Sequence, residues 1–170
     1  MMFRRSVTCA LALTIALAAS AQGSRADLAS LSFLLGDWEA IGTAAGEAGG
    51  FTFSFGVQNH VMTRTNYAIY DAREGRSASR HDDFMIVYAE DGQLRADYFD
   101  SEQHVIRYLV ELQSDHSVVF VSHAKPSEPR YRLSYTARAD GTLAGQFEIA
   151  EPGAPDAFTP YLSWTARKRP

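Results

Sequence analysis

Cysteine is nearly absent from this sequence, which has a single one, Cys9, among 170 residues. Long hydrophobic runs are also scarce, because the longest apolar stretch, residues 7–18, is too short to span a bilayer. The chain has no excess of positive charge either: 16 Lys and Arg stand against 20 Asp and Glu, for a formal net charge of −4. This balance argues against nucleic acid and anionic membranes as partners.

The first 21 residues are typical of a secretory signal peptide. A basic start precedes the apolar stretch, and the small residues Ala19-Ser20-Ala21 follow it. We therefore expect cleavage before Gln22 and a mature domain of residues 22–170 that works in the periplasm or outside the cell. Removing 21 of 170 residues leaves 149, the size of one domain with a single core. Because Cys9 is lost with the signal peptide, the domain has no disulfide and no thiolate metal ligand.

After this segment, the pattern changes from a helical to a strand-like period. Leucines in residues 25–35 recur at the spacing of a short amphipathic helix, which Gly36 ends. From there, short runs rich in Phe, Tyr, Val, Ile and Thr recur about every ten residues between turn-forming residues, as in sequential antiparallel strands. Ten strands are predicted, at residues 37–43, 50–57, 60–70, 82–89, 94–99, 104–112, 118–122, 130–136, 143–150 and 161–168.

Turn signals and alternation within the strands predict an all-β domain. Asp91-Gly92 and Asp140-Gly141 are hairpin signals, and the three aromatic residues of Phe51-Thr52-Phe53-Ser54-Phe55 share one face. Ten such strands in a flat sheet would leave exposed edges, which closure into an antiparallel up-and-down barrel removes. A barrel of about ten strands tends to enclose a cavity of ligand size, so the fold favours a binding function by analogy.

A short motif at the start of the first strand adds a family resemblance. Phe33-Leu34-Leu35-Gly36-Asp37-Trp38-Glu39 resembles the entry motif of lipocalin-like and nitrobindin-like barrels, in which a short helix leads into Gly-x-Trp. The resemblance implies that Trp38 plugs one end of the barrel. It also implies that a basic residue of the last strand, Arg167 or Lys168, packs near the Trp38 ring.

Two further segments extend this resemblance over most of the mature chain. Residues 98–106 and 147–153 are similar to a bacterial exported lipocalin-like family without an assigned function. Nitrobindin-like proteins bind heme through a histidine near the end of the chain, whereas the last histidine here is His123. The resemblance therefore does not extend to heme, and no cofactor is expected.

Polar residues of the central strands are the candidates for a binding site. Arg64 and Asn66 share one face of their strand. If that face points inward, Arg64 is a cationic anchor for a carboxylate or phosphate; if it points outward, Arg64 is a solvated surface residue. The alternating pattern alone does not choose between them. The candidate ligand-binding residues, which form one constellation if they share the lumen, are Arg64, Asn66, His81, Tyr98, His104, Tyr108 and Arg132.

A histidine beside two carboxylates, His81-Asp82-Asp83, opens one predicted strand, and His104 opens another. Such a group could bind a metal or provide a general base, His81 or His104, with Asp83 or Tyr108 as its partner. The plainer interpretation is a hydrogen-bonded strand end at the barrel rim, which we prefer. No metal site and no catalytic residue are therefore assigned.

Three hypotheses of function remain. The first is binding of a small, mostly apolar or amphipathic ligand, with an acidic head group met by Arg64 or Arg132. The second is an enzyme that uses the same cavity and a histidine base. The third is an envelope protein that binds other proteins through an exposed apolar patch around Phe158 and Tyr161. The first hypothesis is favoured. We expect the mature protein to be a monomer or a homodimer without a transmembrane segment.

Overall fold

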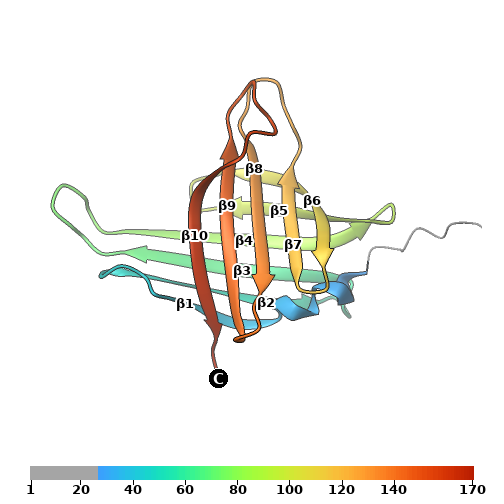
Figure 1. The fold of residues 1–170 in the computed structure, drawn as a ribbon, viewed down its shortest axis with the longest axis horizontal. Helices are drawn as coiled ribbons and strands as arrows, with labels where there is room; N and C mark the ends of the chain where they lie inside the picture. Colours follow the sequence, from blue (N-terminus) through green and yellow to red (C-terminus); the bar gives the residue numbers. More distant parts are fainter. Residues whose placement is uncertain (1–26) are drawn as a thin grey trace, which may run out of the picture.

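The computed structural model describes residues 27–170, and the predicted signal peptide, residues 1–21, lies outside this part. One short helix and ten strands follow one another along the chain (Figure 1). The elements are η1 (Leu28–Leu34), β1 (Gly36–Ile41), β2 (Glu47–Gly56), β3 (Val61–Tyr70), β4 (Ser79–Glu90), β5 (Gln93–Asp100), β6 (Val105–Ser114), β7 (Ser117–Ser122), β8 (Arg130–Ala137), β9 (Thr142–Ala150) and β10 (Thr159–Lys168).

The ten strands form one closed antiparallel barrel. Each strand pairs with the next one along the chain, and β1 pairs with β10 from Trp38↔Lys168 to Ile41↔Thr165. In Figure 1 the strands β8–β10 run across β2–β4, and η1 lies at one end. Because the last ladder closes the sheet, the barrel leaves no edge strand among the described residues. The predicted ten-stranded up-and-down barrel is confirmed, and its architecture is consistent with a lipocalin-like fold.

The helix that precedes the barrel is a tight 3₁₀ helix. The side chain of Asp27 caps it by accepting a hydrogen bond from the backbone N–H of Ala29 at 2.9 Å. A 3₁₀ helix has three residues per turn, so leucines at that spacing form one face. All three are buried: Leu28, Leu31 and Leu34. Among the residues that the structure describes, no helix is long and apolar enough to cross a membrane.

Local turn chemistry determines where several strands end. Asp91 and Gly92, with φ of 51° and 77°, form the two-residue turn between β4 and β5, as the hairpin signal predicts. At the other end of β4 the strand extends further than expected, because it begins at Ser79 and pairs there with Tyr70. Backbone pairing needs no apolar side chain, so the hydrophobic pattern did not reveal this extension.

Side chains fill the middle of the barrel. The rings of Phe53, Phe120 and Tyr135 lie there, each less than 2% exposed. The Tyr135 ring packs edge-on against both of the others, with centroids 5.4 Å from Phe53 and 6.3 Å from Phe120. Aromatic pairs prefer this geometry. The middle of the lumen is therefore a packed core that separates the two ends of the barrel.

Candidate functional site

The end of the barrel beside η1, which we call the closed end, is filled by apolar side chains. Trp38 is 5% exposed, stacks on Phe51 and donates a hydrogen bond from Nε1 to the carbonyl oxygen of Leu34 at 2.7 Å. Of the two basic residues expected near its ring, Lys168 is the one that lies over it, with Nζ 5.8 Å from the ring centroid, and Arg167 does not. Lys168 is the register partner of Trp38, so Arg167 faces the other side of the sheet.

The opposite end of the barrel, which we call the open end, is incompletely filled. Its inward-facing residues are neighbours on adjacent strands, as Tyr98 of β5 is of Ile106 of β6. Their side chains are nevertheless only half-buried. Solvent therefore reaches the lumen from this end. These half-buried residues are Asn66, His81, Tyr98, Ile106, Tyr131 and Phe147.

A buried ion pair forms the floor of the open end. Arg64 is 4% exposed and points into the lumen, where it hydrogen-bonds the carboxylate of Asp83 and the hydroxyl of Tyr135. Asn66 also donates to Asp83, from Nδ2 to Oδ2 at 2.7 Å. Of the two orientations that the sequence left open, the structure has the inward one. The charge of Arg64 is already balanced by Asp83, which is also buried.

Burial shifts the ionisation of the groups on this floor. Desolvation raises the pKa of Tyr135 to about 12, although the charge of Arg64 acts in the opposite direction. Desolvation also raises the pKa of Tyr98 and of Tyr108. For Arg64 desolvation lowers the pKa, but the interactions with Tyr135 and Asp83 outweigh it and the net pKa is raised. The site therefore presents neutral phenols and a permanently charged, paired guanidinium.

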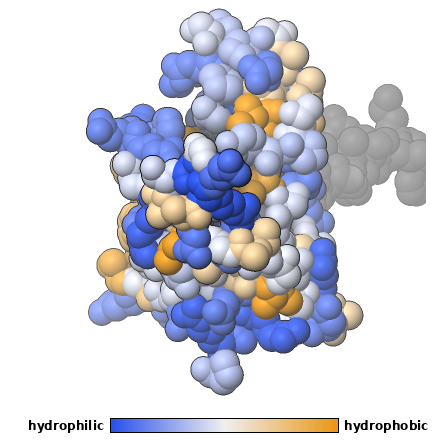
Figure 2. Space-filling model, turned by 90° about the vertical axis from the view of Figure 1, so that its left-hand side faces the viewer, coloured by the Kyte–Doolittle hydropathy of each residue, from blue (hydrophilic) through white to orange (hydrophobic). Residues whose placement is uncertain are grey.

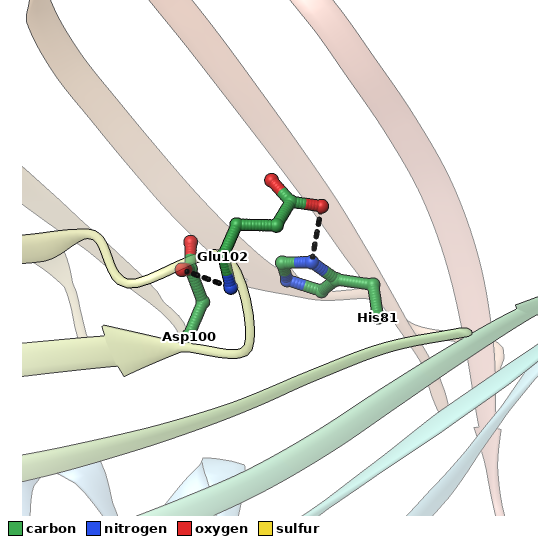
Figure 3. Close-up of side chains that lie close together, drawn as sticks. All are labelled: His81, Asp100 and Glu102. Atoms are coloured by element: carbon green, nitrogen blue, oxygen red, sulfur yellow. Dashed lines mark hydrogen bonds and ion pairs between the residues drawn. The ribbon is translucent and has the colours of Figure 1, made fainter. Parts of the chain in front are cut away.

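Above the floor, His81 lies between two acidic groups and a phenol. Its Nδ1 is 3.3 Å from Oε1 of Glu102, and Figure 3 shows this contact. Its Nε2 is 3.3 Å from the hydroxyl of Tyr98 and 3.5 Å from Oδ2 of Asp83. The His81 side chain is 26% exposed. A half-buried imidazole with carboxylate neighbours can bind a cation through a ring nitrogen.

Asp100 organises the turn that carries Glu102. Its Oδ1 accepts hydrogen bonds from the backbone N–H groups of Glu102 and His104, both at 2.9 Å, and Figure 3 shows the first of them. Its Oδ2 lies 2.8 Å from Nδ1 of the His104 ring. Desolvation acts to raise the pKa of Asp100, but these hydrogen bonds outweigh it and lower the pKa. Asp100 is therefore a carboxylate held in a defined orientation.

The structure brings most of the predicted site residues together, with one clear exception. Tyr108 is 2% exposed and faces the lumen below Tyr98, and His104 joins the cluster through Asp100 at the exposed rim. Arg132 does not join it. Its neighbour Leu133 faces the core, so Arg132 lies on the outer wall, where it pairs with Glu148 and lies over the Phe158 ring.

Sequence reasoning missed Glu102 as a member of the site. Asp83 and Asp100 are register partners in β4 and β5, which places His81 next to the turn that follows β5. The backbone hydrogen bond from Ser101 N–H to the carbonyl of Asp82, at 2.9 Å, continues this pairing into the turn. The signal that could have revealed Glu102 is this register, counted outward from the Asp91-Gly92 hairpin.

Some apolar residues near the rim of the open end are exposed to solvent. Tyr161 is 72% exposed and packs against Phe147, while Phe158 is covered in part by Arg130 and Arg132. On the face shown in Figure 2, hydrophobic residues form small separate areas among hydrophilic ones. This face offers no continuous apolar surface of the kind that marks a protein interface.

Two pockets lie outside the packed lumen. One, of about 220 Å³, is on the wall formed by β1–β4, where Tyr67 lies between Arg80 and Arg169. The other, of about 410 Å³, lies between η1 and the hairpin of β6 and β7, and includes Ser30 and Gln113. The first pocket is also lined by Asn66, at the edge of the open end, but neither pocket includes His81 or Tyr98.

Comparison with known proteins adds no family to this description, because no family model matches the chain and no curated protein is significantly similar to it.

Proposed function

We propose that this protein is an exported barrel that binds a small, mostly apolar molecule at the open end of its lumen. The observation that carries the proposal is the set of inward-facing side chains that remain half-buried at this end. In the middle of the lumen the inward-facing side chains are buried, as at Phe53 and Phe120. A bound molecule that covers the open end would remove this remaining apolar surface from water.

The chemistry of the open end suggests how such a ligand is oriented. Tyr131 and Phe147 are stacked with ring centroids 5.8 Å apart and supply an apolar wall. On the other side, Tyr98, His81 and Asn66 offer hydrogen-bonding groups. An apolar wall with a few placed polar groups is the usual composition of a small-molecule site.

The polar end of the ligand does not need to be an acid. Two arginines were candidates for binding an acidic head group. Arg64 lies in the lumen but is already paired with Asp83, and Arg132 lies on the outer wall. A carboxylate that approached Arg64 would also approach Asp83 and be repelled by it. We therefore expect a neutral group, such as a hydroxyl or carbonyl, to meet the polar side of the site.

Export rests on the first 21 residues, whose pattern supports a signal peptide. Its test is the N-terminal sequence of the protein recovered from the periplasm of an expressing bacterium. A start at Gln22 supports export and cleavage, whereas an intact N-terminus in the cytoplasm contradicts both.

Ligand binding is tested by native mass spectrometry of the protein purified from the periplasm, together with lipid extraction. We expect a reproducible bound molecule in the wild type. Ile106→Trp, which fills the open end from β6, should remove it. A protein that is empty, or an Ile106→Trp variant that keeps the same molecule, contradicts the proposal.

Ile86→Trp is the matched control. Ile86 is also a half-buried isoleucine, but it lies between the inward-facing Met85 and Val87 and therefore faces the outside of the barrel. This variant adds the same bulk without changing the lumen. It should keep the bound molecule, and both variants should retain the far-ultraviolet circular dichroism of the wild type.

A further inference from the structure

The rim of the open end carries a mixed cluster of nitrogen and carboxylate ligands. His81 comes from the start of β4, Asp100 from the end of β5, and Glu102 from the turn after it (Figure 3). One ligand atom of each lies within 4.8 Å of those of the other two. In a tetrahedral site with bonds of about 2.1 Å, neighbouring ligand atoms are about 3.4 Å apart. Small side-chain movements are therefore enough to bring the three groups around one ion.

The charges at this rim are not balanced by Arg or Lys. Asp83 is paired with Arg64, but the ion pairs that the described residues make with Asp100 and Glu102 are all with histidines. A histidine balances a carboxylate only when its ring carries a second proton. A divalent cation would balance Asp100 and Glu102 and would bind the neutral form of His81.

The neighbours of these groups are suited to orienting metal ligands. The Nε2 of His81 faces Tyr98 and Asp83, which leaves Nδ1 directed at Glu102. Asp100 is held by two backbone N–H groups and by the His104 ring. Partners of this kind fix the tautomer and the direction of a ligand before the ion arrives.

From this arrangement we propose a binding site for one divalent transition-metal ion, Zn²⁺ by preference, with His81, Asp100 and Glu102 as ligands. The imidazole nitrogen favours zinc, copper or nickel over calcium and magnesium, which prefer oxygen ligands alone. Three protein ligands leave a fourth position open to solvent. The site shares His81 with the polar side of the proposed ligand site, but Asp100 and Glu102 lie at the rim, away from the wall formed by Tyr131 and Phe147.

Isothermal titration calorimetry with zinc chloride tests this proposal on the mature protein after removal of metals with a chelator. We expect one equivalent of Zn²⁺ to bind, and His81→Gln and Glu102→Gln each to weaken the affinity by roughly tenfold or more. Magnesium chloride should give no comparable binding. The absence of zinc binding by the folded wild type overturns the proposal.

His60→Gln is the matched control, because His60 is an exposed histidine in the turn between β2 and β3, at the closed end. This variant should bind zinc as the wild type does. If His81→Gln and Glu102→Gln also bind as the wild type does, the ion is adventitious and the proposed site is wrong. A rise in melting temperature on adding zinc, present in the wild type and lost in these two variants, provides a second readout.

Discussion

At the scale of single residues, the buried pair of Arg64 and Asp83 is the least expected feature of the barrel. Both side chains are almost without solvent contact, at 5% and 3% exposed. Removing two charges from water is costly, and their mutual attraction together with hydrogen bonds from Asn66 and to Tyr135 offsets that cost. Breaking the pair is therefore worse than replacing it, because one charge is then left buried alone.

Arg64→Met should lower the free energy of unfolding by about 3–5 kcal/mol, because Asp83 loses its buried counter-charge. The double variant Arg64→Met/Asp83→Leu should lose clearly less than the sum of the two single variants, since neither charge remains. Urea unfolding followed by circular dichroism measures these differences. Arg80→Met, which breaks an exposed pair with Asp82, serves as a control and should change little. Strictly additive losses would contradict the coupling.

At the scale of elements, Trp38 joins the first strand to the helix before it. The ring packs within the closed end, and its Nε1 bonds the last helical residue, Leu34. Trp38→Ala should destabilise the protein by about 3–5 kcal/mol through a large cavity. Trp38→Phe keeps much of the packing and should cost less. Thermal and urea unfolding measure both, and an unchanged melting temperature in Trp38→Ala would show that Trp38 does not plug the barrel.

The pairing of β9 with β10 depends on a residue without a side chain. Gly145 is the register partner of both Trp164 and Tyr135, whose rings meet at 5.8 Å over it. A Cβ at Gly145 would overlap the Trp164 ring. Gly145→Ala should therefore destabilise by about 1–3 kcal/mol. Adding Trp164→Leu should recover part of that loss in urea unfolding; equal stability of Gly145→Ala and wild type would mean that the ring moves aside freely.

At the scale of the whole molecule, the closed barrel places most tyrosines where their ionisation opposes folding. Burial raises the pKa of five of the eight tyrosines, namely Tyr88, Tyr98, Tyr108, Tyr131 and Tyr135. Since the folded pKa values exceed the unfolded value of about 10, the stabilisation is fully present below that pH. It is lost as the pH rises through the folded values, such as about 12 for Tyr135.

An alkaline titration followed by tyrosinate absorbance checks this expectation. At about pH 11 the folded protein should contain fewer ionised tyrosines than the same protein in concentrated guanidinium chloride. Urea unfolding at the same pH should give a lower stability than at neutral pH. If the folded and denatured proteins titrate alike, the tyrosines are not shielded by the barrel.

Much of the site's position follows from the order of the strands and was therefore accessible from the sequence. His81, Tyr98 and Tyr108 were predicted as site residues because they lie in central strands, and the structure brings them together at the open end. The zinc ligand Glu102 that we propose was not predicted, since it follows a strand and has no period to reveal it. The sequence left the orientation of Arg132 open, because strand alternation assigns faces only relative to neighbours, and in the structure Arg132 lies on the outer wall.

The sequence by itself determined the local structure of this protein. The number of strands, the Asp91-Gly92 turn and the three-residue spacing of the leucines in η1 depend on short-range backbone preferences, which each segment carries alone. Only the tertiary structure decided which face of each strand points inward. That choice depends on the side toward which the closed sheet curves, and it turned Arg64 toward Asp83 inside the lumen. The register with which β10 closes on β1 set Lys168 over Trp38.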